Sequence, residues 1–331
     1  MIISRTPLRL SFFGGGTDYP VWYRDNPGVV ISASINKYSF ISARYLPPFF
    51  DYKHRIRYYQ NEEVNSIDQI KHPSVRECAK LLGIDKGLEI VHTADLPARS
   101  GLGSSSAFTV GMLNALSSLQ SKMIAKRELA LRAINIEQNI IGEHVGSQDQ
   151  VASAFGGFNL IRFNSRQEIE VDPIIIPEHR LIELQDHLLL CFTGFARTAS
   201  DIAKKQIELT QKKHKELHEM NNITQNAFDI LVDEKESITN FGKLLSDQWN
   251  VKKTMTDQIS NRKINDIYDA GIEGGAIGGK LLGAGSGGFM LFFVKPELHE
   301  SVKAHIGEKL FVPFRFDYTG SKIIYHSHEG Y

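Results

Sequence analysis

The sequence is poor in the features that mark several specialised classes of protein. Its two cysteines, Cys78 and Cys191, are too few and too far apart for a disulfide framework or a cysteine metal site. Lysine plus arginine number 38 and aspartate plus glutamate also 38, without the basic excess typical of nucleic-acid binding. No apolar run approaches the roughly 18 residues of a membrane span, and no secretory signal is apparent. We therefore expect a cytoplasmic globular protein, a monomer or homodimer with neither nucleic-acid nor membrane partners.

The segments that remain predict a mixture of strands and helices. The chain has 331 residues, of which 42% are hydrophobic and 23% charged, and this size suits two domains. Strand-like stretches include IISRTPLRLSFF, GVVISASINKYSFISARYL, GGFNLIRF and HLLLCFTG, whereas residues 126–142 and 198–249 are predicted to be largely helical. Neighbouring strands mixed with helices favour an α+β fold. A polar, proline-containing stretch near residues 160–185 suggests an N-terminal domain of 1–170 and a C-terminal domain of 171–331.

The segment PARSGLGSSSA, residues 97–107, carries the strongest single signal for binding an anion. Glycines let the backbone approach an anion closely, and a helix that begins after them directs its free N–H groups at the same point. Serine hydroxyls add donors, and one could bind Mg²⁺. A serine-capped turn would have much the same composition, so this segment alone leaves both interpretations open. The dinucleotide pattern GxGxxG is excluded, because Ser106 stands in place of its third glycine.

A second glycine-rich segment, GGAIGGK at residues 274–280, imitates a Walker A loop. The residue after Lys280 is Leu281, whereas that loop requires a serine or threonine to bind Mg²⁺. We therefore reject it as a phosphate loop.

Three charged residues lie in positions that call for an explanation. Glu137 falls on the apolar face of the helix predicted for residues 126–142, where a carboxylate is costly unless it is paired or binds a metal. Asp149, in GSQDQ, lies where a new helix begins and is either a dipole-favoured acid or a base. Arg9 lies inside the first predicted strand, and either faces outward or supplies a fixed cation near phosphate charge.

Three segments, in their order along the chain, resemble the motifs of the GHMP small-molecule kinases. They are TPLRLSFFGGGTDYP, LPARSGLGSSSAF and KLLGAGSGGF, and the resemblance extends over nearly the whole chain. It implies an N-terminal domain like ribosomal protein S5 domain 2, a ferredoxin-like C-terminal domain, and a cleft between them for ATP, Mg²⁺ and the acceptor.

The same resemblance implies roles for individual residues. Asp149 matches the catalytic aspartate and Arg9 a catalytic arginine, while Ser105 and Glu137 match the residues that bind Mg²⁺. The ATP-binding residues would be Pro97, Ser100, Gly101, Leu102, Gly103, Ser104, Ser105 and Ser106. The substrate would contact Gly15, Gly16, Thr17, Asp18, Gly283, Ala284 and Gly285.

The first motif also points to the class of acceptor. Galactokinase-like relatives read GEHTDY where this chain reads GGGTDY, so Gly15 and Gly16 replace a glutamate and a histidine. That glutamate binds the distal hydroxyl of galactose, which argues against galactose here. Together with GSQDQ and FTGFARTASDI, residues 192–202, the motif most resembles the D-glycero-D-manno-heptose 7-phosphate kinases. Loss of a carboxylate suits a sugar whose tail carries a phosphate, because like charges repel. Candidate cations for that phosphate are Arg24, Lys37, Arg44 and Arg197.

Other functions remain to be weighed against this one. A kinase for another sugar, such as fucose or galactose, would have the same fold and the same three motifs. A non-catalytic sugar sensor would be expected to have lost a catalytic residue, yet Arg9, Ser105, Glu137 and Asp149 are all present. A nicotinamide-dependent oxidoreductase is excluded by the missing third glycine and by the lack of strand–helix alternation at the N-terminus.

Overall fold

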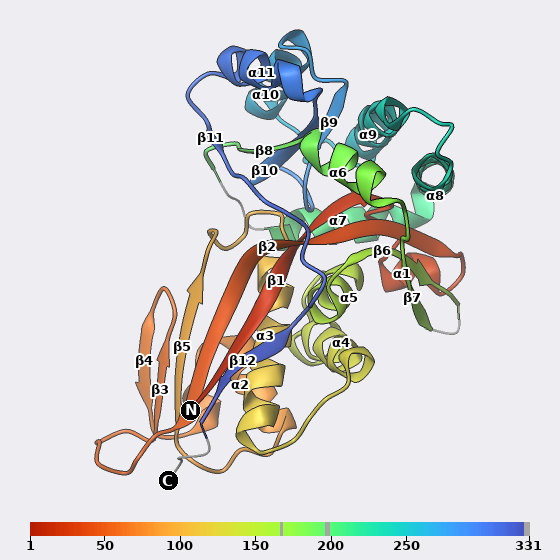
Figure 1. Ribbon diagram of the computed structural model, residues 1–331. Helices are drawn as coiled ribbons and strands as arrows, with labels where there is room; N and C mark the ends of the chain where they lie inside the picture. Colours follow the sequence, from red (N-terminus) through yellow and green to blue (C-terminus); the bar gives the residue numbers. More distant parts are fainter. Residues whose placement is uncertain (166–167, 196–198, 328–331) are drawn as a thin grey trace.

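The computed structural model of the chain describes residues 1–165, 168–195 and 199–327. Arg197, one of the candidate cations, lies outside these ranges. Figure 1 shows one half of the molecule around a large sheet and a second half, built from the later part of the chain, above it. No helix in the described ranges has the length and apolarity needed to cross a bilayer.

The larger sheet has eight strands and forms the N-terminal half. Six follow the order β12-β1-β2-β5-β3-β4, and β6 and β7 extend from β2. Their bounds are β1 (Ile2–Phe13), β2 (Gly28–Tyr45), β3 (His54–Arg57), β4 (Asn61–Val64), β5 (Leu88–Ala94), β6 (Phe158–Phe163), β7 (Ile169–Pro173) and β12 (Lys322–His326). β2 is long enough to pair first with β6 and then with β5, so its two ends belong to different parts of the sheet.

Helices cover one face of this sheet (Figure 1). They are α2 (Pro73–Leu81), α3 (Ser104–Leu119), α4 (Lys126–Ile134), the π-helix η2 (Asn135–Ile141) and α5 (Gln148–Phe155). This half also contains the short α1 (Pro20–Tyr23) and η1 (Ile67–Gln69). The apolar residues of α3 are buried along nearly its whole length, as expected of a helix packed on the centre of a sheet.

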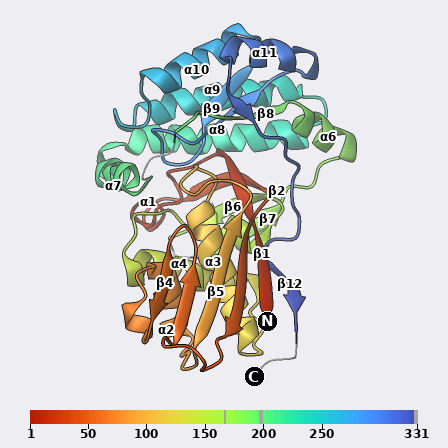
Figure 2. The same cartoon turned by 90° about the vertical axis from the view of Figure 1, so that its left-hand side faces the viewer.

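The C-terminal half has a four-stranded antiparallel sheet in the order β11-β8-β10-β9. Its strands are β8 (Leu188–Phe192), β9 (Gly278–Leu281), β10 (Phe289–Phe293) and β11 (Leu310–Phe311). The helices around it are α6 (Glu178–Asp186), α7 (Ala199–Leu209), η3 (Thr210–Lys212), α8 (His214–Val232), α9 (Ile238–Lys253), α10 (Arg262–Glu273), η4 (Pro296–Leu298) and α11 (His299–Ile306). Figure 2 shows these helices gathered at the end of the molecule opposite the N-terminus.

The expected boundary between residues 170 and 171 does not separate the two halves along the chain. β7 spans that position, and it pairs with β6 in the larger sheet. The last strand, β12, returns to the same sheet and pairs with β1 (Figure 1). β12 therefore completes the N-terminal half, because the edge of β1 offers backbone groups that need partners.

The halves also share an apolar core at the end of β1. The rings of Phe12 and Phe13 lie 5.7 and 5.0 Å from the ring of Phe241 in α9. Lys280 of β9 donates hydrogen bonds to the carbonyls of Ser11 and Phe12, at 3.0 and 2.6 Å. Burial of such aromatic rings stabilises the junction by about 2 kcal/mol each. The GGGTD segment, which follows Phe13 directly, thus begins from a fixed point between the halves.

The helix expected over residues 126–142 changes type partway. It is an α-helix to Ile134 and a π-helix from Asn135. The wider turn of a π-helix moves the buried face, so Ile140, expected on the apolar face, is exposed and Ile136 is buried instead. Glu137 lies in the π-helical part and is still buried. The spacing of an α-helix, on which its predicted position rested, does not apply there.

Candidate active site

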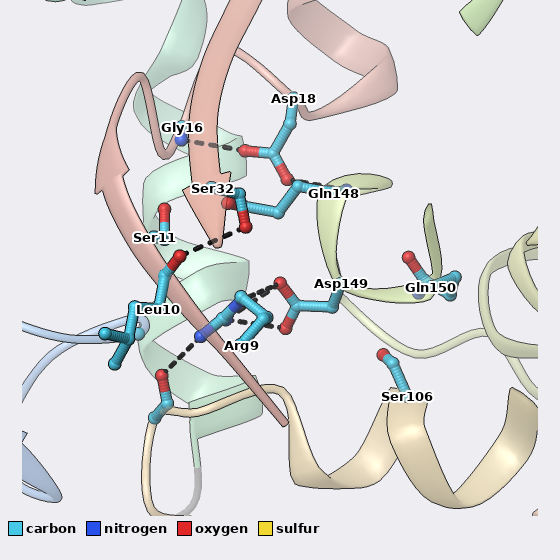
Figure 3. A network of polar contacts seen from close by, with 12 residues as sticks. Arg9, Leu10, Ser11, Gly16, Asp18, Ser32, Ser106, Gln148, Asp149 and Gln150 are labelled. Carbon is cyan, nitrogen blue, oxygen red and sulfur yellow. Dashed lines mark hydrogen bonds and ion pairs between the residues drawn. The ribbon is translucent and has the colours of Figure 1, made fainter. Parts of the chain in front are cut away.

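A cleft with a volume of about 680 Å³ lies between the two halves. Its wall brings together the GGGTD turn, the loop before α3, the start of α5 and the turn between β9 and β10. Figure 3 shows the side chains of Arg9 from β1, Asp18 from the GGGTD turn and Asp149 from the start of α5 in this region.

Arg9 and Asp149 form a bidentate ion pair at the centre of this region. Arg9 Nε and Nη2 each donate to one carboxylate oxygen of Asp149 at 2.8 Å (Figure 3). Arg9 Nη1 donates to the carbonyl of Gly101 at 2.7 Å. The side chain of Arg9 is 3% exposed and that of Asp149 is 25% exposed, so the aspartate faces the cleft while the arginine holds it from behind. A fork of this kind fixes the orientation of a carboxylate more firmly than a single bond would.

The loop before α3 presents a helix N-terminus to the cleft. Gly103 is the N-cap, with φ of 72°, and no side chain caps the first turn. The N–H groups of that turn are therefore available to an anion. A Cβ on Gly103 would lie 3.2 Å from Arg9 Cγ and 3.4 Å from Asp149 Oδ2. Glycine at this position lets the loop lie directly against the ion pair.

The two predicted metal residues, Ser105 and Glu137, form no hydrogen bond with each other among the described residues. Ser106, rather than Ser105, donates to Glu137 Oε2 at 2.8 Å, and Gln150 Nε2 donates to the same oxygen. Ser105 is exposed and lines the cleft, whereas Glu137 is fully buried behind Ser106. Successive residues of a helix point about 100° apart, so the run of three serines did not reveal which one turns inward. Burial raises the pKa of Glu137 to about 7.

Asp18 is placed by the turn that precedes it. Its carboxylate accepts from the backbone N–H of Gly16 at 2.9 Å and of Gln148 at 3.3 Å (Figure 3). Burial raises the pKa of Asp18, and the neighbouring Asp149 adds to this shift. Thr17 Oγ1 donates to the carbonyl of Gly14 at 2.9 Å, which closes the turn. Gly16 and Asp18 line the cleft, whereas Thr17 does not. Thr17 therefore stabilises the turn, and its neighbours are the residues that face the cleft.

The third motif meets the loop before α3 backbone to backbone. A Cβ on Gly101 would lie 2.5 Å from the carbonyl oxygen of Leu282, and one on Gly283 would lie 2.6 Å from the Cα of Gly101. Both glycines have positive φ, 81° and 77°. Gly283 and Ala284 line the cleft, whereas Gly285 packs against Ile259.

Several predicted ATP-binding residues do not line the cleft. Pro97 is exposed outside it, Ser100 is buried, and Leu102 packs into the core that the two halves share. The residues of this set that do line it are Gly101, Gly103, Ser104, Ser105 and Ser106. The glycines and serines of the loop therefore line the cleft, while the side chain of Leu102 between them is buried in the core and holds the loop in place.

Sequence reasoning missed two buried lysines that line the cleft, Lys252 and Lys280. Lys252 Nζ donates to the carbonyl of Gly283 at 2.6 Å. A signal for Lys252 was present, because it continues the buried face of α9 at helical spacing. That face consists of Ile238, Phe241, Gly242, Leu245, Gln248, Trp249 and Lys252.

The candidate cations chosen from sequence lie elsewhere. Arg24 is exposed, and Arg44 forms an ion pair with Glu89. None of Arg24, Lys37 and Arg44 lines the cleft.

One end of the cleft is aromatic. His72 stacks on Phe108 with ring centroids 4.4 Å apart, and His92 meets the edge of the same ring at 4.8 Å. Burial lowers the pKa of His72 to about 4, so its ring is neutral at pH 7. Flat, uncharged rings beside a helix N-terminus suit a planar base attached to phosphates.

Comparison with known proteins agrees with the fold and the motifs. Residues 71–157 match the GHMP kinases N terminal domain and residues 228–310 match the GHMP kinases C terminal domain. The chain belongs to the GHMP kinases, and the expected α+β fold of this family is confirmed. Within the family it is 34% identical to the D-glycero-alpha-D-manno-heptose 7-phosphate kinase of Campylobacter jejuni, over 97% of this chain and 98% of that one.

Solved structures support the same fold. A D-glycero-D-manno-heptose 1-phosphate kinase from Bacteroides thetaiotaomicron superposes with a TM-score of 0.81 at 24% identity, over 99% of this chain and all of that one. The galactokinase of Lactococcus lactis, in complex with galactose, superposes with a TM-score of 0.74 at 19% identity, over 97% and 94% of the two chains. At these identities the likeness describes the fold alone.

Proposed function

We propose that this protein transfers the γ-phosphoryl group of ATP to the anomeric hydroxyl of D-glycero-D-manno-heptose 7-phosphate, giving the 1,7-bisphosphate. The reaction would supply nucleotide-activated heptose for cell-surface glycans and would take place in the cytoplasm. The observation that carries the proposal is the bidentate pair of Arg9 and Asp149, which lies against the uncapped start of α3. The 34% identity to a heptose 7-phosphate kinase over nearly the whole chain supports the choice of substrate.

The residues of the cleft divide the reaction between them. The N–H groups at Gly103 and the first turn of α3 bind the phosphates of ATP, and the aromatic end around Phe108 holds the base. The sugar's anomeric oxygen attacks the γ-phosphorus, the bond from that phosphorus to the β,γ-bridging oxygen breaks, and ADP leaves. Asp149 accepts the hydroxyl proton. Arg9 keeps the carboxylate aimed at that hydroxyl, so positioning contributes more than base strength.

The residues near the start of α3 fit Mg²⁺ in chemical type. Glu137 Oε1 is buried and has no hydrogen-bond partner in the described parts of the chain. Carboxylate and hydroxyl oxygens are ligands that Mg²⁺ accepts. We assign Glu137 and Ser105 to the metal, and Ser106 to orienting Glu137. When bound, Mg²⁺ neutralises charge on the β- and γ-phosphate oxygens.

A panel of acceptors tests the proposal. Release of ADP is measured with heptose 7-phosphate, unphosphorylated heptose, mannose, fucose and galactose, each at saturating ATP and Mg²⁺. We expect the largest kcat/KM with heptose 7-phosphate. Activity confined to fucose or galactose would refute the proposed substrate while leaving a sugar kinase. Absence of ADP release with every acceptor would favour the non-catalytic sensor.

A further inference from the structure

Three hydrogen-bond donors surround the space beside Gly15. A Cβ at this position would lie 3.4 Å from Ser11 Oγ, 3.5 Å from Gln148 Nε2 and 4.0 Å from Lys252 Nζ. All four residues line the cleft. These distances are ordinary contacts, and the φ of Gly15 lies outside the left-handed region that favours glycine. The backbone thus does not require glycine here, and the missing side chain leaves room among the donors.

Two of these donors have hydrogen-bonding capacity that the protein leaves unused. Lys252 Nζ makes a single hydrogen bond within the described residues, to the carbonyl of Gly283. Its side chain is buried, and a buried ammonium is costly unless an anion or further acceptors meet it. Gln148 Nε2, which lies beside Gly15, makes no hydrogen bond within the described residues and is therefore free to donate.

The nearby carboxylates are already engaged. Asp18 accepts from two backbone N–H groups, and Asp149 accepts from Arg9 on both oxygens. Lys252 forms no ion pair with either among the described residues. Burial lowers the pKa of Lys252 to about 8, so most of its ammonium groups still carry their charge at pH 7. A buried positive charge therefore faces the cleft without an anion of its own.

We propose that Lys252, Gln148 and Ser11 bind the terminal phosphate of the acceptor sugar, and that this group of residues makes the enzyme select phosphorylated sugars. The inference rests on the proposed function, which supplies the phosphorylated acceptor. In Figure 3 the pair of Arg9 and Asp149 lies between Ser106, near the start of α3, and the turn at Gly16. The transferred phosphoryl group belongs on the Ser106 side, so the donors around Gly15 meet the far end of the sugar.

Kinetics with matched pairs of acceptors test this assignment. The pairs are heptose 7-phosphate against heptose and mannose 6-phosphate against mannose, with saturating ATP and Mg²⁺. Lys252→Met should raise KM for the phosphorylated member by about tenfold to a hundredfold, the contribution of a charge-assisted hydrogen bond. It should change kcat by less than about threefold and lower kcat/KM for the phosphorylated member far more than for the unphosphorylated one. Lys243→Met, on the exposed face of the same helix, is the control.

A second variant tests the space itself. Gly15→Glu would place a carboxylate among the three donors, and its Cβ meets only ordinary contacts. We expect it to raise KM for phosphorylated acceptors at least as much as Lys252→Met does, because the carboxylate occupies the site and repels phosphate.

Equal losses with both members of a pair would overturn the inference and would place Lys252 at the transferred phosphoryl group. Unchanged kinetics in both variants would overturn it as well. A wild-type enzyme that uses mannose 6-phosphate in place of heptose 7-phosphate, with the same dependence on Lys252, would contradict the proposed substrate but support the phosphate site. A wild-type enzyme that uses only unphosphorylated sugars would contradict both.

Discussion

The buried charge of Lys252 should lower the stability of the folded protein in a manner that depends on pH. Burial lowers its pKa from 10.5 to about 8. Between these values the unfolded chain binds more protons than the folded one, so stability rises with pH. The destabilisation is complete below pH 8 and disappears above pH 10.5. From the shift, we calculate a cost of about 3 kcal/mol at pH 7 that falls to about 1 kcal/mol at pH 10.

Lys252→Met removes this titration, and comparison with the wild type isolates it. The variant also loses the hydrogen bond to Gly283, and any weakening of that bond on deprotonation of Lys252 is already contained in the shifted pKa. We therefore expect the free energy of unfolding of the variant, relative to wild type, to decrease by about 2 kcal/mol between pH 7 and pH 10. Urea denaturation at a series of pH values measures it. Lys243→Met, whose lysine is exposed, should show no such trend. A constant difference between Lys252→Met and wild type across this range would refute the reasoning.

Three further variants test other parts of the account. Asp149→Asn should lower kcat by roughly 10²- to 10⁴-fold and leave the Kd of ATP, measured by calorimetry, unchanged; near wild-type turnover would contradict its assignment as the base. Glu137→Gln should raise the Mg²⁺ concentration needed for half-maximal activity by at least about tenfold, whereas an unchanged Mg²⁺ titration would remove Glu137 from the metal site. Gly101→Ala, with a Cβ 2.5 Å from the carbonyl oxygen of Leu282 and φ of 81°, should lose about 1–3 kcal/mol of stability in urea denaturation; an unaffected midpoint would show that the loop can move.

The parts of the site that were predicted from sequence are those that local chemistry encodes. The proposed phosphate loop needs glycines followed by a helix start, and that order can be read directly in residues 101–106. Arg9 stood out because a charged side chain is unusual inside a predicted strand, whereas the resemblance to the GHMP kinases singled out Asp149. The structure then brings these two side chains together across 140 residues of sequence, which the residues alone did not specify.

The parts that were missed depend on how the helices are packed. Lys252 lies at helical spacing from the apolar residues of α9, but a lysine at such a position can also extend its amine into solvent, and the packing of the helix decides that it is buried. The packing of α3 likewise decides which serine of its first turn points inward. Ser106 does so and donates a hydrogen bond to Glu137. The π-helix over residues 135–141 shifts the buried face because its turns are wider than the 3.6 residues assumed by the sequence pattern.

The central claim is that the anomeric hydroxyl of a heptose 7-phosphate accepts the γ-phosphoryl group of ATP. Nuclear magnetic resonance of the product tests it directly, because a phosphate on the anomeric oxygen couples to the anomeric proton. We predict one new phosphorus signal with this coupling, formed in equal amount with ADP, while the original phosphate signal persists. A new signal coupled to any other sugar proton, or no new signal at all, would contradict the account.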